Sequence, residues 1–260
     1  MTWNIKYVKV KVEKYHYWFL YLFLEDRPVV IQFAARNAFE FANAAELAAP
    51  YADGIDLNCG CPQRWALQEG IGAKLMHVDP EHLKDMIRQA RGRTVDTPVS
   101  VKIRIYEDRR RTVELARQLE SVGASWVTVH GRRKDQKPSE PIDPESIKLV
   151  KEALNIPVIA NGNVFTRQEA EELHKATGAN GIMSARGLLE NPALFAGYDK
   201  TPWEAVQKYV ELATTFGSCH AIMHHHLVTM MQNVLPTSSA RHFNTLTSIP
   251  SIIDFINEHL

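Results

Sequence analysis

Cys61 lies in an unusual setting, between Gly60 and Pro62 in the stretch GIDLNCGCPQ (residues 54–63). Proline restricts the residue before it to extended backbone, and glycine permits a sharp turn just ahead. The thiol is therefore held rigidly just beyond an apolar run. A cysteine that only fills space would more often lie within the run, as Cys59 does. We predict a reactive Cys61, suited to nucleophilic or acid chemistry, and a structural Cys59.

Glycine and polar residues also gather after two later apolar runs, IPVIA and GIMS. The two groups are Asn161-Gly162-Asn163 and Ala185-Arg186-Gly187. Glycine lets backbone N–H groups approach an anion closely, and arginine adds a positively charged fork. Either group alone is typical of a tight turn or a surface cation. Together they predict a phosphate-binding site.

Two cations occur inside a third apolar run, VKIRI (residues 101–105). Lys102 and Arg104 share one face of it because strand side chains alternate. Cations at such positions require a partner, so either a buried salt bridge or an anionic or electron-rich cofactor would explain them. Gln32 and His130 also fall at the ends of apolar runs. Neither residue by itself indicates a function, and each becomes a candidate site residue only because other polar residues also end the apolar runs.

Six short β-rich runs position these residues, with helical patterns between them. The runs cover residues 29–33, 54–58, 99–105, 126–131, 156–162 and 180–187, and the helical patterns cover residues 39–52, 79–91, 110–124, 143–154 and 166–179. This alternation predicts an α/β protein with a parallel sheet. Polar residues end every run, and the carboxyl ends of many strands meet at one point only in a closed sheet. We therefore predict a TIM (β/α)8-type barrel rather than an open doubly wound sheet.

A closed barrel of this type needs eight strands, and six runs carry the signature. Residues 4–12 alternate as a strand would, and residues 17–24 are apolar, but neither run ends in glycine, proline or small polar residues. The later helical patterns cover residues 202–217, 220–235 and 251–260. The predicted domains are an atypical N-terminal segment at 1–28, which leaves the barrel incomplete there, the barrel at 29–200 and a small all-α domain at 201–260.

The 30 basic and 30 acidic residues cancel, so net charge gives no argument for a nucleic-acid partner. Basic residues cluster in two predicted loops, at 109–111 and 132–137, where they are either solvated or steer a polyanionic substrate.

Three cysteines cannot form a disulfide framework and favour a reducing compartment. No apolar run is long enough to span a membrane. The C-x-C pair and the run of three histidines at 224–226 do not match zinc-ligand spacing, so no metal site is predicted.

At these motifs the chain resembles the tRNA-dihydrouridine synthase family. The motifs are IDLNCGCPQ, GIGAKLM, VKIRI, WVTVHGR, IPVIANGN and IMSARGLLENPALF, within about residues 28–200. NCGCPQRW and ARGLLENPALFAGY most resemble the eukaryotic branch that acts on D-loop uridines 20a and 20b. The resemblance implies an FMN-binding barrel and a helical tRNA-binding domain, in a cytoplasmic protein or, as the alternative, a nuclear one. It also implies that NADPH or NADH reduces the flavin, which passes hydride to C6 of a flipped-out uracil while a cysteine protonates C5.

The resemblance assigns roles by motif, with Cys61 as the proton donor. The implied flavin contacts are Gln32, Lys102 and His130, the implied phosphate ligands are Asn161, Gly162, Asn163, Ala185 and Arg186, and the residues implied near the substrate base are Asn58 and Arg132. Family members open with two strands, the first ending in an Ala-Pro-Met-like turn, which residues 1–28 do not match. Two alternatives stay open: another FMN barrel that acts on a free pyrimidine, and an inactive, truncated tRNA-binding remnant.

Overall fold

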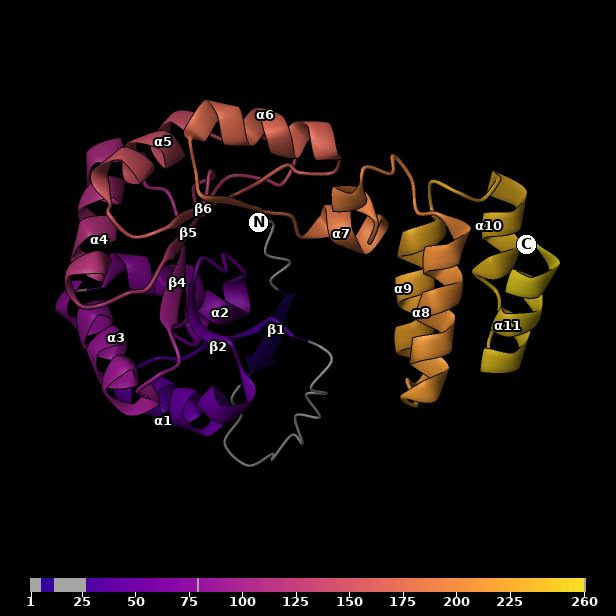
Figure 1. The fold of residues 1–260 in the computed structure, drawn as a ribbon, viewed down its shortest axis with the longest axis horizontal. Helices are drawn as coiled ribbons and strands as arrows, with labels where there is room; N and C mark the ends of the chain where they lie inside the picture. The colour runs from indigo at the N-terminus through magenta and orange to yellow at the C-terminus, as the bar shows by residue number, and fades with distance from the viewer. Residues whose placement is uncertain (1–5, 12–26, 79, 260) are drawn as a thin grey trace. The chain divides into compact units, whose positions relative to one another are not determined.

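The computed structural model describes residues 6–11, 27–78 and 80–259 (Figure 1). Its sheet contains the strands β1 (Lys6–Lys11), β2 (Val29–Ala34), β3 (Gly54–Cys59), β4 (Val99–Arg104), β5 (Val127–His130), β6 (Val158–Asn161) and β7 (Gly181–Met183). The pairs from β1 to β6 are parallel. The six strands predicted from the sequence are confirmed as β2 to β7.

Helices connect the strands, and the helical patterns predicted from the sequence are confirmed. The helices are α1 (Ala38–Ala48), η1 (Ala49–Tyr51), α2 (Arg64–Gln68), η2 (Gly72–His77), α3 (Pro80–Thr94), α4 (Arg109–Ser121), α5 (Pro144–Ala153), α6 (Arg167–Thr177), α7 (Arg186–Glu190), η3 (Leu194–Ala196), α8 (Trp203–Thr215), α9 (His220–Met231), α10 (Thr237–Phe243) and α11 (Ile249–Glu258). Side chains of Asn37, Asp108 and Asp143 cap α1, α4 and α5 by accepting backbone N–H groups. These caps set where each helix begins.

The order of the strands in the sheet is also their order in the chain, from β1 to β7. A doubly wound sheet would reverse its order at a switch point. Sequential order is the winding of a (β/α) barrel, and Figure 1 shows α1, α3, α4 and α5 along the outside of the strands. The predicted barrel class is therefore confirmed.

The N-terminal region contributes one strand to this sheet. Residues 6–11 form β1, which pairs with β2 from Lys6 opposite Val29 to Lys11 opposite Ala34. Of the alternating pattern at 4–12, which left the assignment undecided, the described residues 6–11 thus form a strand. The apolar segment at 17–24 lies outside the described residues. The described part of the chain holds seven strands, against eight in a closed TIM barrel.

The two faces of the sheet differ in polarity. One face carries Ile31, Phe33, Ile55, Leu57, Val101, Ile103, Val127 and Val129, and the other carries Gln32, Asp56, Asn58, Ser100, Lys102, Thr128 and His130. Helices that cover a sheet bury apolar side chains, so the apolar face lies under the helices and the polar face lines the interior. Barrel interiors are usually filled with branched apolar side chains. A polar interior must therefore be hydrogen-bonded internally or serve a ligand.

The chain separates into two compact units. The first holds Met1–Gly162 and Leu173–Ile182, and the second holds Asn163–Glu172 and Met183–Leu260. Within the second unit, α8 to α11 share a hydrophobic core that includes Met223, Leu227, Phe243 and Phe255. The C-terminal helices thus bury an apolar core of their own.

Candidate active site

The turn that carries Cys61 is held by the side chain of Asn58. Asn58 Oδ1 accepts hydrogen bonds from the backbone N–H groups of Gly60 and Cys61, both at 3.0 Å. This arrangement turns the chain just after β3. The Cys61 carbonyl accepts the N–H of Ala73, in η2, at 2.9 Å. Cys61 is half-buried with a free thiol, so the structure holds it rigidly without covering it.

Gly72 lies directly against this turn. Its φ of +64° is in the left-handed region, which favours glycine. A Cβ at this position would lie 2.7 Å from the Cys61 carbonyl oxygen and 2.8 Å from Cys61 Cβ. No side chain fits here unless the Cys61 turn moves, so close contact with Gly72 helps to fix the position of the turn.

Gly72→Ala is expected to destabilise the protein by about 1–3 kcal/mol and to speed alkylation of Cys61, because the added methyl group separates η2 from the turn. Gly70→Ala is the matched control, since Gly70 also has positive φ (+77°) but its Cβ would meet only Arg36 Cγ, at 3.9 Å. Urea unfolding and peptide-resolved iodoacetamide labelling measure the two effects. Equal stability and equal labelling rates in the two variants would contradict the close contact between Gly72 and the Cys61 turn.

A chain of hydrogen bonds runs from Asn58 into the interior. Asn58 Nδ2 donates to Gln32 Oε1 at 2.8 Å, and Gln32 Nε2 donates to Asp56 Oδ2 at 2.7 Å. The hydroxyl of Ser100 donates to Asp56 Oδ1 at 2.5 Å. The Cys61 turn is thereby connected, through two amides, to a carboxylate between β2 and β4. We call Asn58, Gln32, Asp56 and Ser100 the interior network.

Asp56 is the residue that sequence reasoning missed. It is 0% exposed, and burial raises its pKa from 3.8 to about 6, although hydrogen bonds from Ser100 and Gln32 and the charge of Lys102 oppose the rise. Burial also raises the pKa of the Cys59 thiol, and the nearby Asp56 charge adds to that rise. One sequence signal was present: Asp56 is a charged residue inside an apolar run, two positions before Asn58 and so on the same face.

The two cations predicted to share a face of β4 do so, because Val101 and Ile103 are fully buried on the other face. Arg104 Nε donates to the Gly60 carbonyl at 2.7 Å, and Nη1 donates to the Arg133 carbonyl at 2.8 Å. Arg104 therefore braces the backbone before Cys61, a role not among the two predicted alternatives. Lys102 is the register partner of Asn58, beside the interior network.

His130 and Arg132 contact each other at the end of β5. Arg132 Nη1 lies 3.3 Å from His130 Nε2. Arg132 is 2% exposed, and its Nε donates to the Glu140 carbonyl at 2.7 Å. It thus shapes the loop after β5. Its predicted place near a substrate base stays a prediction.

Asn161 and Gly162 follow β6 beside His130. The Asn161 carbonyl accepts the N–H of Gly131 at 3.1 Å, and the register pairs Asn161 with His130. Gly162 has φ +135°, and a Cβ there would lie 2.6 Å from Ile142 Cγ2 and 3.2 Å from His130 Cδ2. Only glycine fits, which keeps this strand end close to the neighbouring one.

The three remaining predicted phosphate ligands belong to the second unit. Asn163 has a positive φ of +50°, Ala185 precedes α7, and the Arg186 guanidinium lies 5.1 Å from the centre of the Phe165 ring. Cation–π contact of this kind orients the side chain. The phosphate role of all three stays a prediction from their motifs.

Among the residues that the structure describes, no three His, Cys, Asp or Glu side chains gather closely enough to hold a metal ion. Over the same residues, no helix has the length and apolar character that crossing a bilayer requires.

The fold and the site together define a (β/α)-barrel enzyme with a polar interior and a braced thiol at the carboxyl end of the sheet. A family model described as dihydrouridine synthase (Dus) matches residues 8–249, and the chain belongs to this family. The resemblance stated from the motifs is therefore confirmed.

Curated relatives cover most of the chain. The Homo sapiens protein named tRNA-dihydrouridine(20a/20b) synthase (NAD(P)+)-like is 46% identical over 237 residues, which cover 90% of this chain and 74% of that protein. The Schizosaccharomyces pombe protein named tRNA-dihydrouridine(20a/20b) synthase (NAD(P)+) is 40% identical over 235 residues, or 90% of this chain and 72% of that protein. The crystal structure of DHODH from Eimeria tenella matches with a TM-score of 0.53 and 12% identity, over 81% of this chain and 65% of that one, and supports the fold alone.

Proposed function

We propose that this chain is an FMN-dependent tRNA-dihydrouridine synthase, which reduces uridine in the D-loop of tRNA with NADPH or NADH. The observation that carries the proposal is the Cys61 turn, bonded through Asn58 to a buried polar interior. The names of the human and fission-yeast relatives specify tRNA, positions 20a and 20b and NAD(P)+, and we extend these to the chain.

The polar interior fits a flavin by its donor groups. Gln32, Lys102 and His130 supply an amide, an ammonium group and an imidazole on one face of adjacent strands. Bound FMN would supply hydride for reduction of the uracil ring. The positive charge of Lys102 would favour an electron-rich ring nearby. The proposed phosphate ligands are Asn161, Gly162, Asn163, Ala185 and Arg186.

Cys61 would donate the proton that reduction of uridine requires at C5. A thiol serves as a general acid only if it is held at a constant distance from the acceptor carbon. Asn58, by hydrogen bonds, and Gly72, by close contact, both restrict the turn, which meets this requirement. Asn58 keeps a second amide N–H besides the one given to Gln32, and this group would contact the substrate base. Arg132 would act there by shaping the loop after β5.

The tRNA would be attracted by the barrel loops more than by the C-terminal helices. Residues 201–260, the proposed helical tRNA-binding domain, contain two cations (Lys208, Arg241) and four acids (Glu204, Glu211, Asp254, Glu258), so 2 − 4 gives a net charge of −2 with neutral histidines. Residues 109–111, which were predicted to lie in a loop but form the first turn of α4, and the loop residues 132–137 are mainly basic. RNA affinity depends mostly on cations near phosphates. The helices would therefore contribute shape, and the loops charge.

The proposal is tested with the purified chain, FMN, NADPH or NADH, and unmodified tRNA. We expect saturable flavin binding and dihydrouridine formation in tRNA, measured by mass spectrometry of nuclease digests. Free uracil and dihydroorotate are the comparison substrates. Turnover of a free pyrimidine without turnover of tRNA, or failure to bind FMN, would refute the proposed activity.

A further inference from the structure

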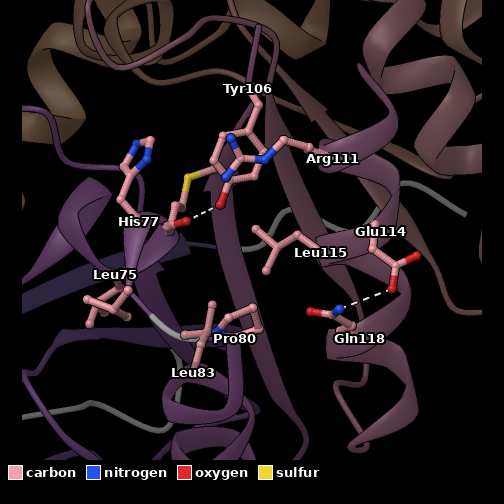
Figure 2. A pocket seen from close by; sticks show the side chains of 11 residues that line it. Leu75, His77, Pro80, Leu83, Tyr106, Arg111, Glu114, Leu115 and Gln118 are labelled. Carbon is pink, nitrogen blue, oxygen red and sulfur yellow. Dashed lines mark hydrogen bonds between the residues drawn. The ribbon is translucent and has the colours of Figure 1, made fainter. Parts of the chain in front are cut away.

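A cavity lies in the first unit where η2 meets the residues after β4 and the start of α4, and Cys61 is not among its lining residues (Figure 2). Its volume is about 220 Å³. That is below the ~300 Å³ at which sites for whole small-molecule ligands begin, so it suits a fragment the size of one base. Leu75, Leu83 and Leu115 form an apolar floor, and Figure 2 shows Tyr106, His77 and Arg111 grouped together above it.

The upper part of this cavity is an ordered aromatic and cationic group. The Arg111 guanidinium lies 4.6 Å from the centre of the Tyr106 ring, and the His77 ring meets Tyr106 edge-on at 5.5 Å. The Tyr106 hydroxyl donates to the Met76 carbonyl, which fixes the ring orientation. Aromatic and arginine planes set in this way are the usual platforms for unpaired bases.

Positive charge collects around the cavity. Lys74, Arg111 and Lys134 all act on His77, whose pKa is lowered first by burial and then by these three charges. Among the described lining residues the one carboxylate, Glu114, accepts a hydrogen bond from Gln118 at 3.0 Å (Figure 2).

Neighbouring cations are engaged in ion pairs. Arg109 pairs with Asp143 at 2.9 Å, and Arg133 pairs with Asp135 at 3.3 Å. Over the described residues neither Arg111 nor Lys134 forms a salt bridge, although the charge of Lys134 also acts on Asp135.

We propose that this cavity binds one unpaired nucleotide of the RNA substrate, with its base on the apolar floor beside Tyr106 and its phosphate against Arg111 and Lys134. This inference rests on the proposed function for the identity of the RNA. The cavity adds a recognition point outside the reacting uridine, on the basic loops rather than on the acidic helical segment. A single strand presents both groups together, an open base face and a phosphate, whereas a duplex hides the base.

The test compares two double variants that each remove two positive charges. R111Q/K134Q removes one cation that lines the cavity and one whose charge acts on its His77, and R117Q/K151Q changes α4 and α5 at residues outside the lining. Fluorescence anisotropy with unmodified tRNA, a short single-stranded RNA and a duplex RNA is measured across a salt series. We expect R111Q/K134Q to weaken single-strand and tRNA binding about tenfold and to lower the salt slope by about two, with a smaller effect on the duplex. R117Q/K151Q is expected to stay near wild type.

The outcomes separate this inference from the proposed function. Equal losses in the two double variants, equal losses on duplex and single strand, or no single-strand binding by the wild type would each overturn the cavity assignment. Arg111-dependent binding of single-stranded RNA by a wild type that forms no dihydrouridine would support the cavity and refute the activity. Dihydrouridine formation with unaltered RNA binding in R111Q/K134Q would support the activity and refute the cavity.

Discussion

Cys61→Ala is expected to lower the rate of dihydrouridine formation in tRNA by about 10²–10⁴-fold, the usual contribution of a positioned general acid. Flavin binding should persist, because the interior network forms without the thiol: its hydrogen bonds use Asn58, Gln32, Asp56 and Ser100 side chains. Single-turnover assays with prereduced enzyme isolate the proton-transfer step, and flavin absorbance reports cofactor binding in the same sample.

Two controls sharpen this result. Cys219→Ala removes an exposed thiol of the second unit and should leave turnover near wild type. Cys61→Ser keeps a hydroxyl in the turn but is a far weaker acid, so it should resemble the alanine variant in rate and the wild type in stability. Turnover of Cys61→Ala within a few-fold of wild type would remove Cys61 from the mechanism.

Asp56→Ala is expected to destabilise the protein by about 3–5 kcal/mol. Removing the carboxylate leaves the Gln32 amide without its acceptor in a place closed to water, and leaves the Ser100 hydroxyl only the Ile55 carbonyl, at 3.4 Å. Asp56→Asn is the matched variant, because its carbonyl can accept from Gln32 while its amide donates to Ser100. We expect the asparagine variant to fold with stability close to wild type near pH 4, and urea unfolding measures both.

The free energies of unfolding of wild type and Asp56→Asn should depend differently on pH. The folded-state pKa of Asp56, about 6, is above its ordinary 3.8, so the folded protein holds this proton more tightly than the unfolded chain. The resulting stabilisation is complete below about pH 3.8 and is lost as pH rises through 6. A shift of about two pKa units corresponds to about 3 kcal/mol.

Between pH 4 and 7, the free energy of unfolding of wild type should therefore fall by up to about 3 kcal/mol relative to that of Asp56→Asn. The asparagine variant has no proton to release at this position. Unfolding at fixed ionic strength across this range measures the difference. A constant difference across the range would mean that Asp56 is ionised normally, against the burial argument.

Much of the fold followed from local pattern. The runs that became β2 to β7 are short and mostly apolar, and helical patterns separate them, so their class and order were readable directly. Thr166 and Glu169 form the capping box that starts α6, with both of its hydrogen bonds present, at 3.1 and 3.0 Å. The short helices α2, α7 and α10 were missed, because five to seven residues carry too little periodicity.

The N-terminal strand shows a different limit of prediction from sequence. Residues 4–12 alternate, but such a pattern does not say which strand it pairs with. The parallel pairing of β1 with β2 depends on hydrogen bonds to residues more than twenty positions away, at Val29 and beyond. An unusual ending without glycine or proline did not prevent that pairing.

The sequence by itself determined the barrel class and the rigid setting of Cys61, because backbone preferences of glycine and proline and the period of side chains act over a few residues. The tertiary structure alone decided that Asp56 anchors Gln32, that Arg104 braces Gly60 and that Tyr106 lies under Arg111 above a cavity. The first two contacts join residues 24 and 44 positions apart, and strand register sets them. Local sequence does not encode that register, so it had to be seen in three dimensions.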